Sequence, residues 1–306
     1  MNPSTFANTS SLTPRANAAR WKQGWAWALV LTVALALALA LNHLPFTAVD
    51  WLLYEKTLAH PLDPYRFDFF NPPWTVWFLL PLGWASSYSV GAVRVVMLAV
   101  FVRLAYSRGV RGVNLALLAS SAPLLFLVAN GNIDFLPALG FLLADKGSGL
   151  ALLLVKPQTG IFAALAWMRR AGGWRGVVRM LLPTLGLFAL SLLLYGWWPA
   201  RAIGNVLRMQ GVGLPNVAWN TSVFPWGVPL GLYLAWRAWR NADEFHGVTA
   251  SLLLSPYTPL YSLTLWYTLF LGRARRWQAV LAWLIFWLVY AWHYLGVGAW
   301  LLNRIS

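Results

Sequence analysis

Carboxylates are the scarcest chemically useful groups in this sequence, which has 8 Asp and Glu residues against 23 Lys and Arg residues. Half of them fall in one short window: Asp50, Glu55, Asp63 and Asp68. A carboxylate can take a proton from a hydroxyl group, so a cluster of carboxylates marks a candidate catalytic segment. Loops also tolerate charge without any functional reason, and this alternative stays open for Glu55, Asp63 and Asp68.

Asp50 differs from the other three in its surroundings. It lies in FTAVDWLLYEKTLAH, shortly after the apolar run 25–41, and Val49, Trp51 and Tyr54 make this stretch amphipathic. Such a stretch is typical of a helix that lies on the membrane surface. A carboxylate held at that height could meet the head group of a lipid-linked substrate.

Three further ionisable side chains stand next to or inside apolar runs: Asp134 in ANGNIDFL, Lys156 in LLLVKPQTG and Arg94 in VGAVRVVML. An ionisable group at membrane depth is costly, so each is a candidate for a functional site. The alternative is structural, because Lys156 can snorkel toward the interface or pair with Asp134. For Arg94 we favour structural pairing.

The composition excludes the soluble classes of protein. Of the 306 residues, 59% are hydrophobic and only 10% are charged, whereas a soluble domain carries about 25% charged residues. The chain is therefore expected to be an integral membrane protein. Its net charge of +15 comes from small cationic clusters between apolar runs, so no nucleic-acid partner is expected. With no Cys and four scattered His, the sequence excludes disulfides and offers no metal-ligand spacing.

The cationic residues predict how the chain crosses the membrane. The first apolar run follows Arg15, Arg20 and Lys22, so residues 1–22 are expected to form a cytoplasmic tail and residues 23–306 one transmembrane domain. A secretory signal peptide fits less well, because the polar leader is long and no convincing cleavage site follows. Further clusters close other apolar stretches and are also expected to be cytoplasmic: Arg103/Arg108/Arg111, Arg169/Arg170/Arg175/Arg179, Arg237/Arg240 and Arg273/Arg275/Arg276.

Three apolar stretches do not fit simple upright helices. The stretches 73–106, 133–168 and 247–271 are too long for one upright helix, or only just long enough for two short ones. Each is interrupted by Gly, Pro or Ser, which predicts short or broken helices. The runs are continuously apolar rather than alternating, which argues against a membrane β-barrel. We therefore predict an all-α fold, a polytopic transmembrane helical bundle of about eight to eleven spans.

Two loops are long enough to hold a site, from about residue 43 to residue 73 and from about residue 197 to residue 224. If the N-terminus is cytoplasmic, the first loop is on the outer side and carries the amphipathic juxtamembrane helix. The second loop follows a span that leaves an arginine cluster, so it is expected on the same side. Trp197, Trp198 and Trp226 near its ends fit an interfacial aromatic belt.

Four segments, in chain order, carry a resemblance to a known family. They are DWLLYEKTLAHPLDPYRFDFFNPPWTVWFLLPL at 50–82, GNIDFLPALGFLLADKGSGLALLLVKPQTGIFAALAWMRR at 131–170, WNTSVFPW at 219–226 and LLSPYTPLYSL at 253–263. In this order they resemble the GT-C superfamily of membrane glycosyltransferases. The greatest similarity is to the glycosyltransferase 87 family of bacterial mannosyltransferases that use polyprenol-phosphate-mannose.

The resemblance implies a reaction and its participants. A sugar, mannose or another hexose or pentose, would pass with inversion from a polyprenyl-phosphate-linked donor to a hydroxyl of a glycan or glycolipid acceptor on the outer face. Asp50 matches the family's loop aspartate and would be the general base. The protein would be a multi-pass protein of a bacterial inner membrane, with its N-terminus in the cytoplasm and membrane lipids around it.

The residues also offer binding groups for such a reaction. Cations or several donors should meet the lipid phosphate, and polar or aromatic side chains should orient the sugars. Structural alternatives remain open, because loop arginines also pair with lipid phosphates and tyrosines near a helix break often only pack. The expected substrate-binding residues are Tyr54, Asp63, Arg66, Asp68, Asn132, Asp134, Lys156, Gln158, Arg201, Arg208, Asn220, Ser222, Tyr257 and Tyr261.

No cofactor is indicated, although Asp50 together with Asp63 or Asp68 could supply a site for a divalent metal. Two other functions compete with glycosyl transfer. A transporter or a flippase for a lipid-linked sugar would also use broken helices and buried ionisable residues. A noncatalytic membrane scaffold would not need the four ordered segments.

Overall fold

The computed structural model describes residues 32, 36, 39–43, 48–67, 69–144, 147–211 and 220–294. This part of the chain is all-helical, with no strand and a single isolated bridge between Asn220 and Pro259. Most of the expected first helix, Asp68 and the cytoplasmic tail lie outside the described residues. The all-α prediction is confirmed for the residues that are described.

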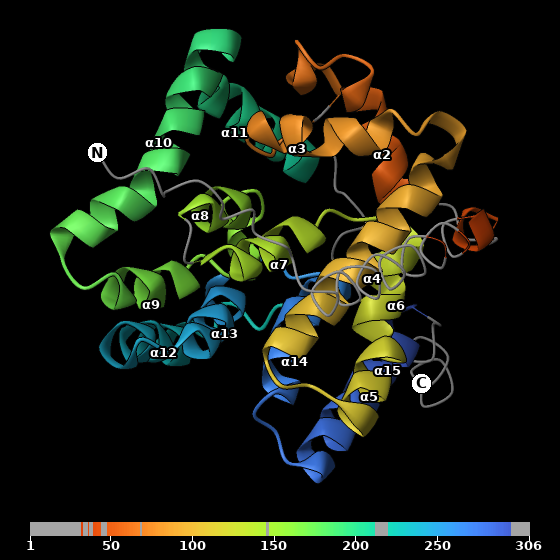
Figure 1. Cartoon of the computed structure of the whole chain (residues 1–306), viewed down its shortest axis with the longest axis vertical. Helices are drawn as coiled ribbons and strands as arrows, with labels where there is room; N and C mark the ends of the chain where they lie inside the picture. The colour runs from red at the N-terminus through yellow and green to blue at the C-terminus, as the bar shows by residue number, and fades with distance from the viewer. Residues whose placement is uncertain are drawn as a thin grey trace, which may run out of the picture.

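Short helices dominate the first half of the fold, and longer helices follow (Figure 1). The first half contains α2 (Val49–Leu58), η1 (Pro64–Phe67), α3 (Trp74–Gly83), η2 (Ser86–Tyr88), α4 (Ser89–Ser107), α5 (Gly112–Ala119), α6 (Ala122–Asn130), α7 (Phe135–Leu142) and α8 (Ser148–Leu153). The second half contains η4 (Pro157–Thr159), α9 (Ala163–Arg170), α10 (Trp174–Tyr195), α11 (Trp198–Gly211), α12 (Val228–Asn241), α13 (Glu244–Leu254), η6 (Leu260–Ser262), α14 (Leu263–Leu271) and α15 (Arg276–Tyr294).

Two helical segments are long and apolar enough to cross a membrane, judged by length and composition. They are Ser86–Ser107, which contains η2 and α4, and Trp174–Tyr195, which is α10. A third crossing is possible if α5 and α6, which are bent by 45° at their junction, act as one span. The described helices therefore reach two or three such segments, fewer than the eight to eleven expected, because most apolar stretches are divided into pieces shorter than a membrane is thick.

The three stretches expected to be broken are indeed divided. The first is interrupted between α3 and α4 at Ser86, whose φ of 49° lies in the left-handed region. The second is split into α7, α8, η4 and α9, and Pro157 begins η4 directly after Lys156. The third is interrupted between α13 and η6 by Ser255–Pro259, which includes two prolines. Proline removes a backbone donor and disfavours a helix interior, so Pro157, Pro256 and Pro259 explain the second and third breaks. Pro81 and Pro183 are nevertheless accommodated inside α3 and α10.

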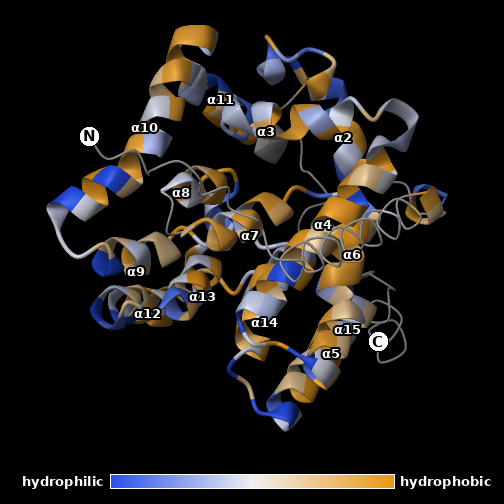
Figure 2. Cartoon of the chain, viewed as in Figure 1, coloured by the Kyte–Doolittle hydropathy of each residue, from blue (hydrophilic) through white to orange (hydrophobic). Residues whose placement is uncertain are grey.

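Helix α10 exposes a row of large apolar side chains. Leu182, Leu185 and Leu194 are more than half exposed, and Leu193 is 84% exposed. Figure 2 shows the end of this helix beyond its arginine-bearing start as predominantly hydrophobic. Apolar surface of this extent is unfavourable in water and favourable in lipid.

Packing around α7 and α4 forms the centre of the fold. Helix α7 contacts α8 on one side and α4 on the other, and α13 contacts α9 and α12. Gly140 of α7 and Gly149 of α8 allow the first of these contacts, because a Cβ on Gly140 would lie 2.7 Å from the carbonyl oxygen of Gly149. In Figure 1, α2, α3 and α11 lie toward one end of the molecule and α5 and α15 toward the other.

Arg94 is fully buried in α4 and binds main-chain carbonyls. Its Nε donates to Val128 O at 2.9 Å and its Nη2 to Ala129 O at 3.1 Å, and Nη1 donates to Leu41 O. The carbonyls of Val128 and Ala129 belong to the last turn of α6, where the backbone carbonyls have no hydrogen-bond donors within the helix. These contacts are those of a structural cation, as favoured from the sequence.

Candidate active site

Asp50 lies in the first turn of α2 and is partly exposed. Helix α6 ends directly beside it at Gly131, whose φ of 69° reverses the chain. A Cβ on Gly131 would lie 2.7 Å from the Cβ of Trp51, so only glycine allows this close approach. The turn delivers the next residue, Asn132, to Asp50: Asn132 Nδ2 donates to Asp50 Oδ2 at 2.7 Å.

The amide of Asn132 connects Asp50 to Lys156. Asn132 Oδ1 accepts a hydrogen bond from Lys156 Nζ at 2.8 Å, while Nδ2 also donates to the hydroxyl oxygen of Tyr261 at 3.0 Å. An ammonium group can only donate and a carboxylate can only accept, so these two neighbours fix the orientation of the amide. Asn132 therefore holds the carboxylate and the cation at opposite ends of one planar group.

Lys156 also binds Asp134, and both side chains are buried. Lys156 Nζ lies 3.0 Å from Asp134 Oδ2 and 4.8 Å from the centre of the Tyr261 ring. Ser262 Oγ donates to the same carboxylate oxygen at 3.2 Å. Among the described residues, Asp134 Oδ1 has no hydrogen-bond partner although it is buried. We call Asp50, Asn132, Asp134, Lys156, Tyr261 and Ser262 the Lys156 cluster.

The Lys156 cluster holds two carboxylates and one cation. Burial raises the pKa of Asp50 above its ordinary value, and this effect outweighs the opposing hydrogen bond from Asn132 and the charge of Lys156. A carboxylate with a raised pKa holds a proton more strongly than a freely solvated one. When it is ionised, Asp50 is therefore a stronger proton acceptor than an aspartate in free contact with water.

Two tyrosines flank Asp50. Tyr54 is buried one helical turn along α2, on the same face as Asp50. Tyr257 precedes η6, and burial, followed by the charges of Asp50 and Asp134, raises the pKa of its hydroxyl to about 12. Both hydroxyls thus stay protonated at neutral pH and can donate hydrogen bonds. Gln158 follows Lys156 in η4 and is half-buried.

A second group of expected site residues gathers where the two long loops meet. Arg201 of α11 pairs with Asp63 and lies over the ring of Tyr65, 5.4 Å from its centre. Tyr65 stacks on Trp198 at a centroid distance of 6.2 Å. The structure thus brings α11, the helix that replaces the first half of the expected second loop, against η1 of the first.

Two more of the expected arginines stand near this contact, Arg66 in η1 and Arg208 in the last turn of α11. Arg66 is exposed and lies 5.6 Å from the centre of the Phe67 ring. Arg208 donates to the side-chain oxygen of Asn205, whose Nδ2 donates to Phe69 O at 2.7 Å. The ring of Phe69 contacts both Tyr54 and Tyr65, so an aromatic path connects the arginines with α2.

Asn220 and Ser222 bind backbone groups of the break between α13 and η6. Asn220 Nδ2 donates to Pro256 O at 2.8 Å, and its Oδ1 accepts from Thr258 N at 2.8 Å. Ser222 Oγ donates to Ser255 O at 2.5 Å. These side chains therefore shape the segment that leads to Tyr261, and their polar atoms face protein backbone.

Ser262 and the arrangement around Glu244 were not found from the sequence. One serine among many in an apolar chain carries no signal of its own, so Ser262 could not have been singled out. At the N-terminus of α13, the buried Glu244 carboxylate accepts from Arg108, from Arg170 at 2.9 Å and from Trp167 at 3.2 Å. We call Glu244, Arg108, Arg170 and Trp167 the Glu244 cluster.

The described residues contain no group of three or more His, Asp or Glu side chains that could hold a metal ion. The chemistry on offer is thus that of a partly exposed carboxylate, a buried cation and several neutral donors. Such a set can accept a proton from a hydroxyl and can meet a phosphate oxygen. No family model, no curated protein and no solved structure matches the chain.

Proposed function

We propose that this chain is a polytopic membrane glycosyltransferase with Asp50 as its general base. It transfers a sugar, mannose or another hexose or pentose, from a polyprenyl-phosphate donor to a glycan or glycolipid hydroxyl. The proposal includes a bundle of about eight to eleven spans in a bacterial inner membrane, some of them short or broken. We also propose that the N-terminus lies in the cytoplasm and that the chain is related to the glycosyltransferase 87 family.

One observation carries this proposal: the carboxylate of Asp50 is held by Asn132, which is itself held by Lys156. Asp50 is partly exposed in the first turn of α2, whereas Lys156 is buried. A hydroxyl can therefore approach Asp50 from outside, with a cation fixed two hydrogen bonds away. A base and a cation at this separation suit a displacement in which a proton leaves one reactant and negative charge develops on another.

In the proposed transfer step, every bond and proton is accounted for by the two substrates and Asp50. The acceptor oxygen attacks the anomeric carbon, a new carbon–oxygen bond forms, and the bond to the phosphate oxygen breaks on the opposite side. The electron pair of the broken bond stays on the lipid phosphate, and the acceptor proton goes to Asp50. Attack opposite to the leaving group gives inversion at the anomeric carbon.

Charge on the leaving phosphate needs a cation or several donors. Lys156 is the cation of the Lys156 cluster, and Arg66, Arg201 and Arg208 stand on the neighbouring loops. We assign Lys156 to orient the site and Arg201 to meet the lipid phosphate. Arg201 is the better candidate for that contact because it reaches solvent and its ion pair with Asp63 is exposed.

The distribution of cations agrees with this orientation. Arginines from three sequence clusters meet at one end of α13, since Arg108 and Arg170 bind Glu244 and Arg273 binds Asp243. The segment after the other end of α13 leads into the Lys156 cluster. A cationic end on the cytoplasmic side leaves Asp50 and the two long loops for the outer side.

A transporter or flippase is the alternative, and the Lys156–Asp134 pair is the observation that favours it. This pair joins the start of α7 to the break between α8 and η4, and transporters bind substrates at such interrupted helices. The two functions differ in their products. A transferase consumes the donor, whereas a flippase moves it unchanged across the membrane.

The test is sugar transfer by purified protein in proteoliposomes. Radiolabelled polyprenyl-phosphate-mannose is supplied with a bacterial lipid and glycan extract, and wild type is compared with Asp50→Asn. The amide keeps the shape of the side chain but cannot take the proton, so transfer should fall by about 10²–10⁴-fold with the fold retained. Asp243→Asn is the matched control, because Asn caps a helix as well as Asp does. Asp243 lies at the N-terminus of α13, whereas the segment that leads to the Lys156 cluster follows the C-terminus of that helix.

Full transfer by Asp50→Asn would contradict the assignment of the base. If neither protein consumed polyprenyl-phosphate-mannose or donors with other sugars, the transferase itself would be rejected. Movement of intact donor across the bilayer under those conditions would establish the transporter instead.

A further inference from the structure

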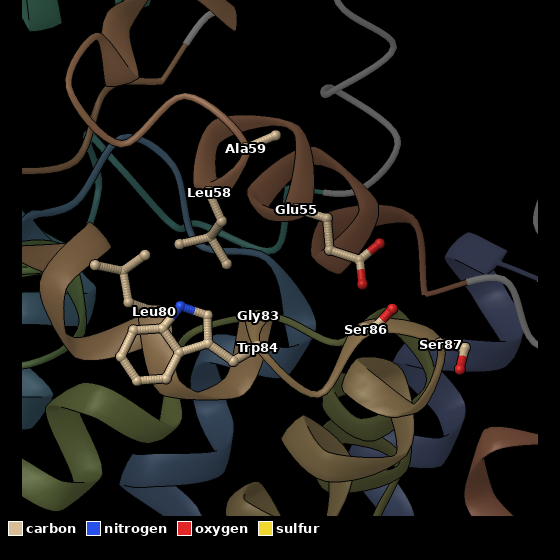
Figure 3. A pocket seen from close by; sticks show the side chains of 8 residues that line it. All are labelled: Glu55, Leu58, Ala59, Leu80, Gly83, Trp84, Ser86 and Ser87. Carbon is tan, nitrogen blue, oxygen red and sulfur yellow. The ribbon is translucent and has the colours of Figure 1, made fainter.

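A cavity that the mechanism above does not use lies between α2 and the turn that joins α3 to α4 (Figure 3). Its volume is about 510 Å³, within the size range of sites for small organic ligands. Leu58, Leu80 and Trp84 make one part of its wall apolar. Glu55, Ser86 and Ser87 add a carboxylate and two hydroxyl groups.

Glu55 is held in place from behind. Its Oε1 accepts hydrogen bonds from Trp51 Nε1 at 3.0 Å and from Ser89 Oγ, and both donors come from outside the cavity wall. Figure 3 shows the carboxylate turned toward the side chain of Ser86. A carboxylate fixed in this way presents a hydrogen-bond acceptor to the cavity without the entropy cost of ordering a free side chain.

The backbone at Ser86 is strained. Its φ of 49° lies in the left-handed region, which a residue with a Cβ seldom adopts. This conformation ends the turn after Trp84 and places the two serines beside Glu55. Backbone strain of this kind is found where a side chain has to be presented to a ligand, and here it coincides with the polar wall of the cavity.

Trp84 supplies an aromatic surface. The side chain lies on the cavity wall and is 77% exposed. An indole face next to hydroxyl groups and a carboxylate suits a ligand with apolar C–H groups on one face and hydroxyls at its edge. A pyranose ring has this combination.

Other ligands fit less well. Among the residues that line the cavity there is no Lys, Arg or His, so nothing would neutralise a phosphate group, which Glu55 would repel. A hydrocarbon tail would leave the carboxylate and the serine hydroxyls without partners, at a considerable desolvation cost. The cavity therefore selects a neutral polyol over both halves of a polyprenyl phosphate.

We propose that this cavity is a saccharide-binding subsite, which holds the sugar portion of the acceptor. The assignment of the ligand to the acceptor rests on the proposed function, whereas the binding of a saccharide does not. Glu55 stands about 7.5 Å from Asp50 along the axis of α2, from a rise of about 1.5 Å per residue. Trp51 follows Asp50 in the chain and hydrogen-bonds Glu55, so the subsite and the base share one helix.

Direct binding is measured by saturation-transfer difference NMR on the purified full-length chain in detergent. The probes are the neutral methyl glycosides of mannose, glucose, galactose and arabinose, with inorganic phosphate and farnesyl phosphate as competitors. At least one glycoside should bind, with the strongest transfer on ring C–H protons, and neither competitor should displace it. Trp84→Ala should weaken binding about tenfold, since an aromatic contact contributes up to about that factor.

Two further variants keep the test independent of Trp84. Ala59 also lines the cavity and is exposed, so Ala59→Trp should fill the space and abolish binding without burying new groups elsewhere. Glu55→Gln should weaken binding by removing the charged acceptor while keeping the side-chain shape. Trp174→Ala is the matched control, because Trp174 is 72% exposed at the start of α10 and should leave binding unchanged.

Absence of binding by all four glycosides would overturn the proposal. Unchanged binding in both Ala59→Trp and Trp84→Ala would also overturn it, and Trp84 would then be a membrane anchor. Displacement of the glycoside by farnesyl phosphate would overturn it as well. Saccharide binding without donor consumption would therefore keep the subsite and reject the transferase, whereas transfer that is unaffected by filling the cavity would reject the subsite alone.

Discussion

The Glu244 cluster and the Lys156 cluster are both buried groups of charges, but their balance is opposite. Glu244 has one carboxylate, and its two oxygens receive Arg108, Arg170 and an indole N–H. The Lys156 cluster has one cation for two carboxylates, and Asp134 Oδ1 has no hydrogen-bond partner among the described residues. One cluster is saturated with donors, and the other lacks them.

This difference separates a structural from a functional set of charges. Burying a polar atom without a partner costs about 1–3 kcal/mol. Arg108 Nε in the Glu244 cluster is also buried without a partner, so the distinction rests on the carboxylates: those of the Lys156 cluster outnumber its cation, and one of their oxygens is unpaired. The arginines of the Glu244 cluster also reach water, with Arg170 45% exposed, whereas Lys156 is 5% exposed. We infer that the Glu244 cluster holds α4, α9 and α13 together, whereas the Lys156 cluster binds a ligand.

The largest effect is expected when the single cation of the Lys156 cluster is removed. Lys156→Met leaves Asp134 buried and unpaired, which should lower the free energy of unfolding by about 3–5 kcal/mol. Thermal unfolding in detergent measures the loss, and the transfer assay should show no product.

A double variant shows whether that loss comes from the stranded carboxylate. Lys156→Met combined with Asp134→Leu removes both charges and should recover most of the stability, because an apolar pair of similar volume often replaces a buried ion pair at little cost. Transfer should stay absent. Recovery of transfer together with stability would show that the Lys156 cluster is as structural as the Glu244 cluster.

A smaller loss is expected at the saturated cluster. Glu244→Gln removes the charge that two arginines share, but both can turn toward water, so the free energy of unfolding should fall by about 1–3 kcal/mol. Transfer per folded molecule should equal that of wild type. A selective loss of transfer with unchanged stability would erase the distinction between the clusters.

How much of this could be read from the sequence differs between the clusters. Asp50, Asp134 and Lys156 were expected near a substrate, because carboxylates are scarce and ionisable groups in apolar runs are conspicuous. Asn132 and Tyr261 were expected there because they lie in the segments that carry the family resemblance. Their hydrogen bonds could not be predicted, since they depend on a left-handed turn at Gly131 and on the break before η6. Local sequence fixes such breaks, but not which residues they bring together.

The breaks themselves were predictable, whereas the number of membrane-spanning helices stays a prediction. Gly, Pro and Ser inside the apolar stretches indicated broken helices, and the structure has them. Hydropathy alone cannot distinguish a short buried helix such as α7 from half of a span, because both are continuously apolar. Asn220 illustrates a related limit: its polarity suggested a sugar contact, but its side chain binds the backbone near Pro256.

The pKa shifts of Asp50 in α2 and of Asp243 at the N-terminus of α13 have opposite directions and give a pH test. Burial raises the pKa of Asp50; at Asp243 burial also acts upward, but the hydrogen bond and charge of Arg273 prevail and lower the pKa. Transfer needs ionised Asp50, so the rate should fall with decreasing pH at a higher pH than for a solvated aspartate. Asn132→Leu removes a hydrogen bond that favours the charged form, so the acidic limb should move to still higher pH.

Stability should respond to pH in opposite ways at the two aspartates. A raised pKa means that Asp50 contributes stability below its unfolded pKa and loses it as pH rises through the folded value. Asp50→Asn should therefore gain stability relative to wild type as pH increases. The lowered pKa of Asp243 predicts the reverse for Asp243→Asn, which should lose stability relative to wild type over the same rise. Parallel behaviour of the two variants in unfolding scans would contradict the assigned directions.

The smallest change in stability is expected at Arg201, which lies outside both clusters in an exposed ion pair with Asp63. Arg201→Ala should change the free energy of unfolding by less than about 1 kcal/mol, because water screens such pairs. If Arg201 meets the lipid phosphate, KM for the donor should nevertheless rise while KM for the acceptor stays constant. Arg237 offers a matched control, since it also lies over a tyrosine ring but in a cluster expected to be cytoplasmic. Equal donor KM values in Arg201→Ala, Arg237→Ala and wild type would contradict the assignment of Arg201 to the lipid phosphate and would shift that role toward Lys156.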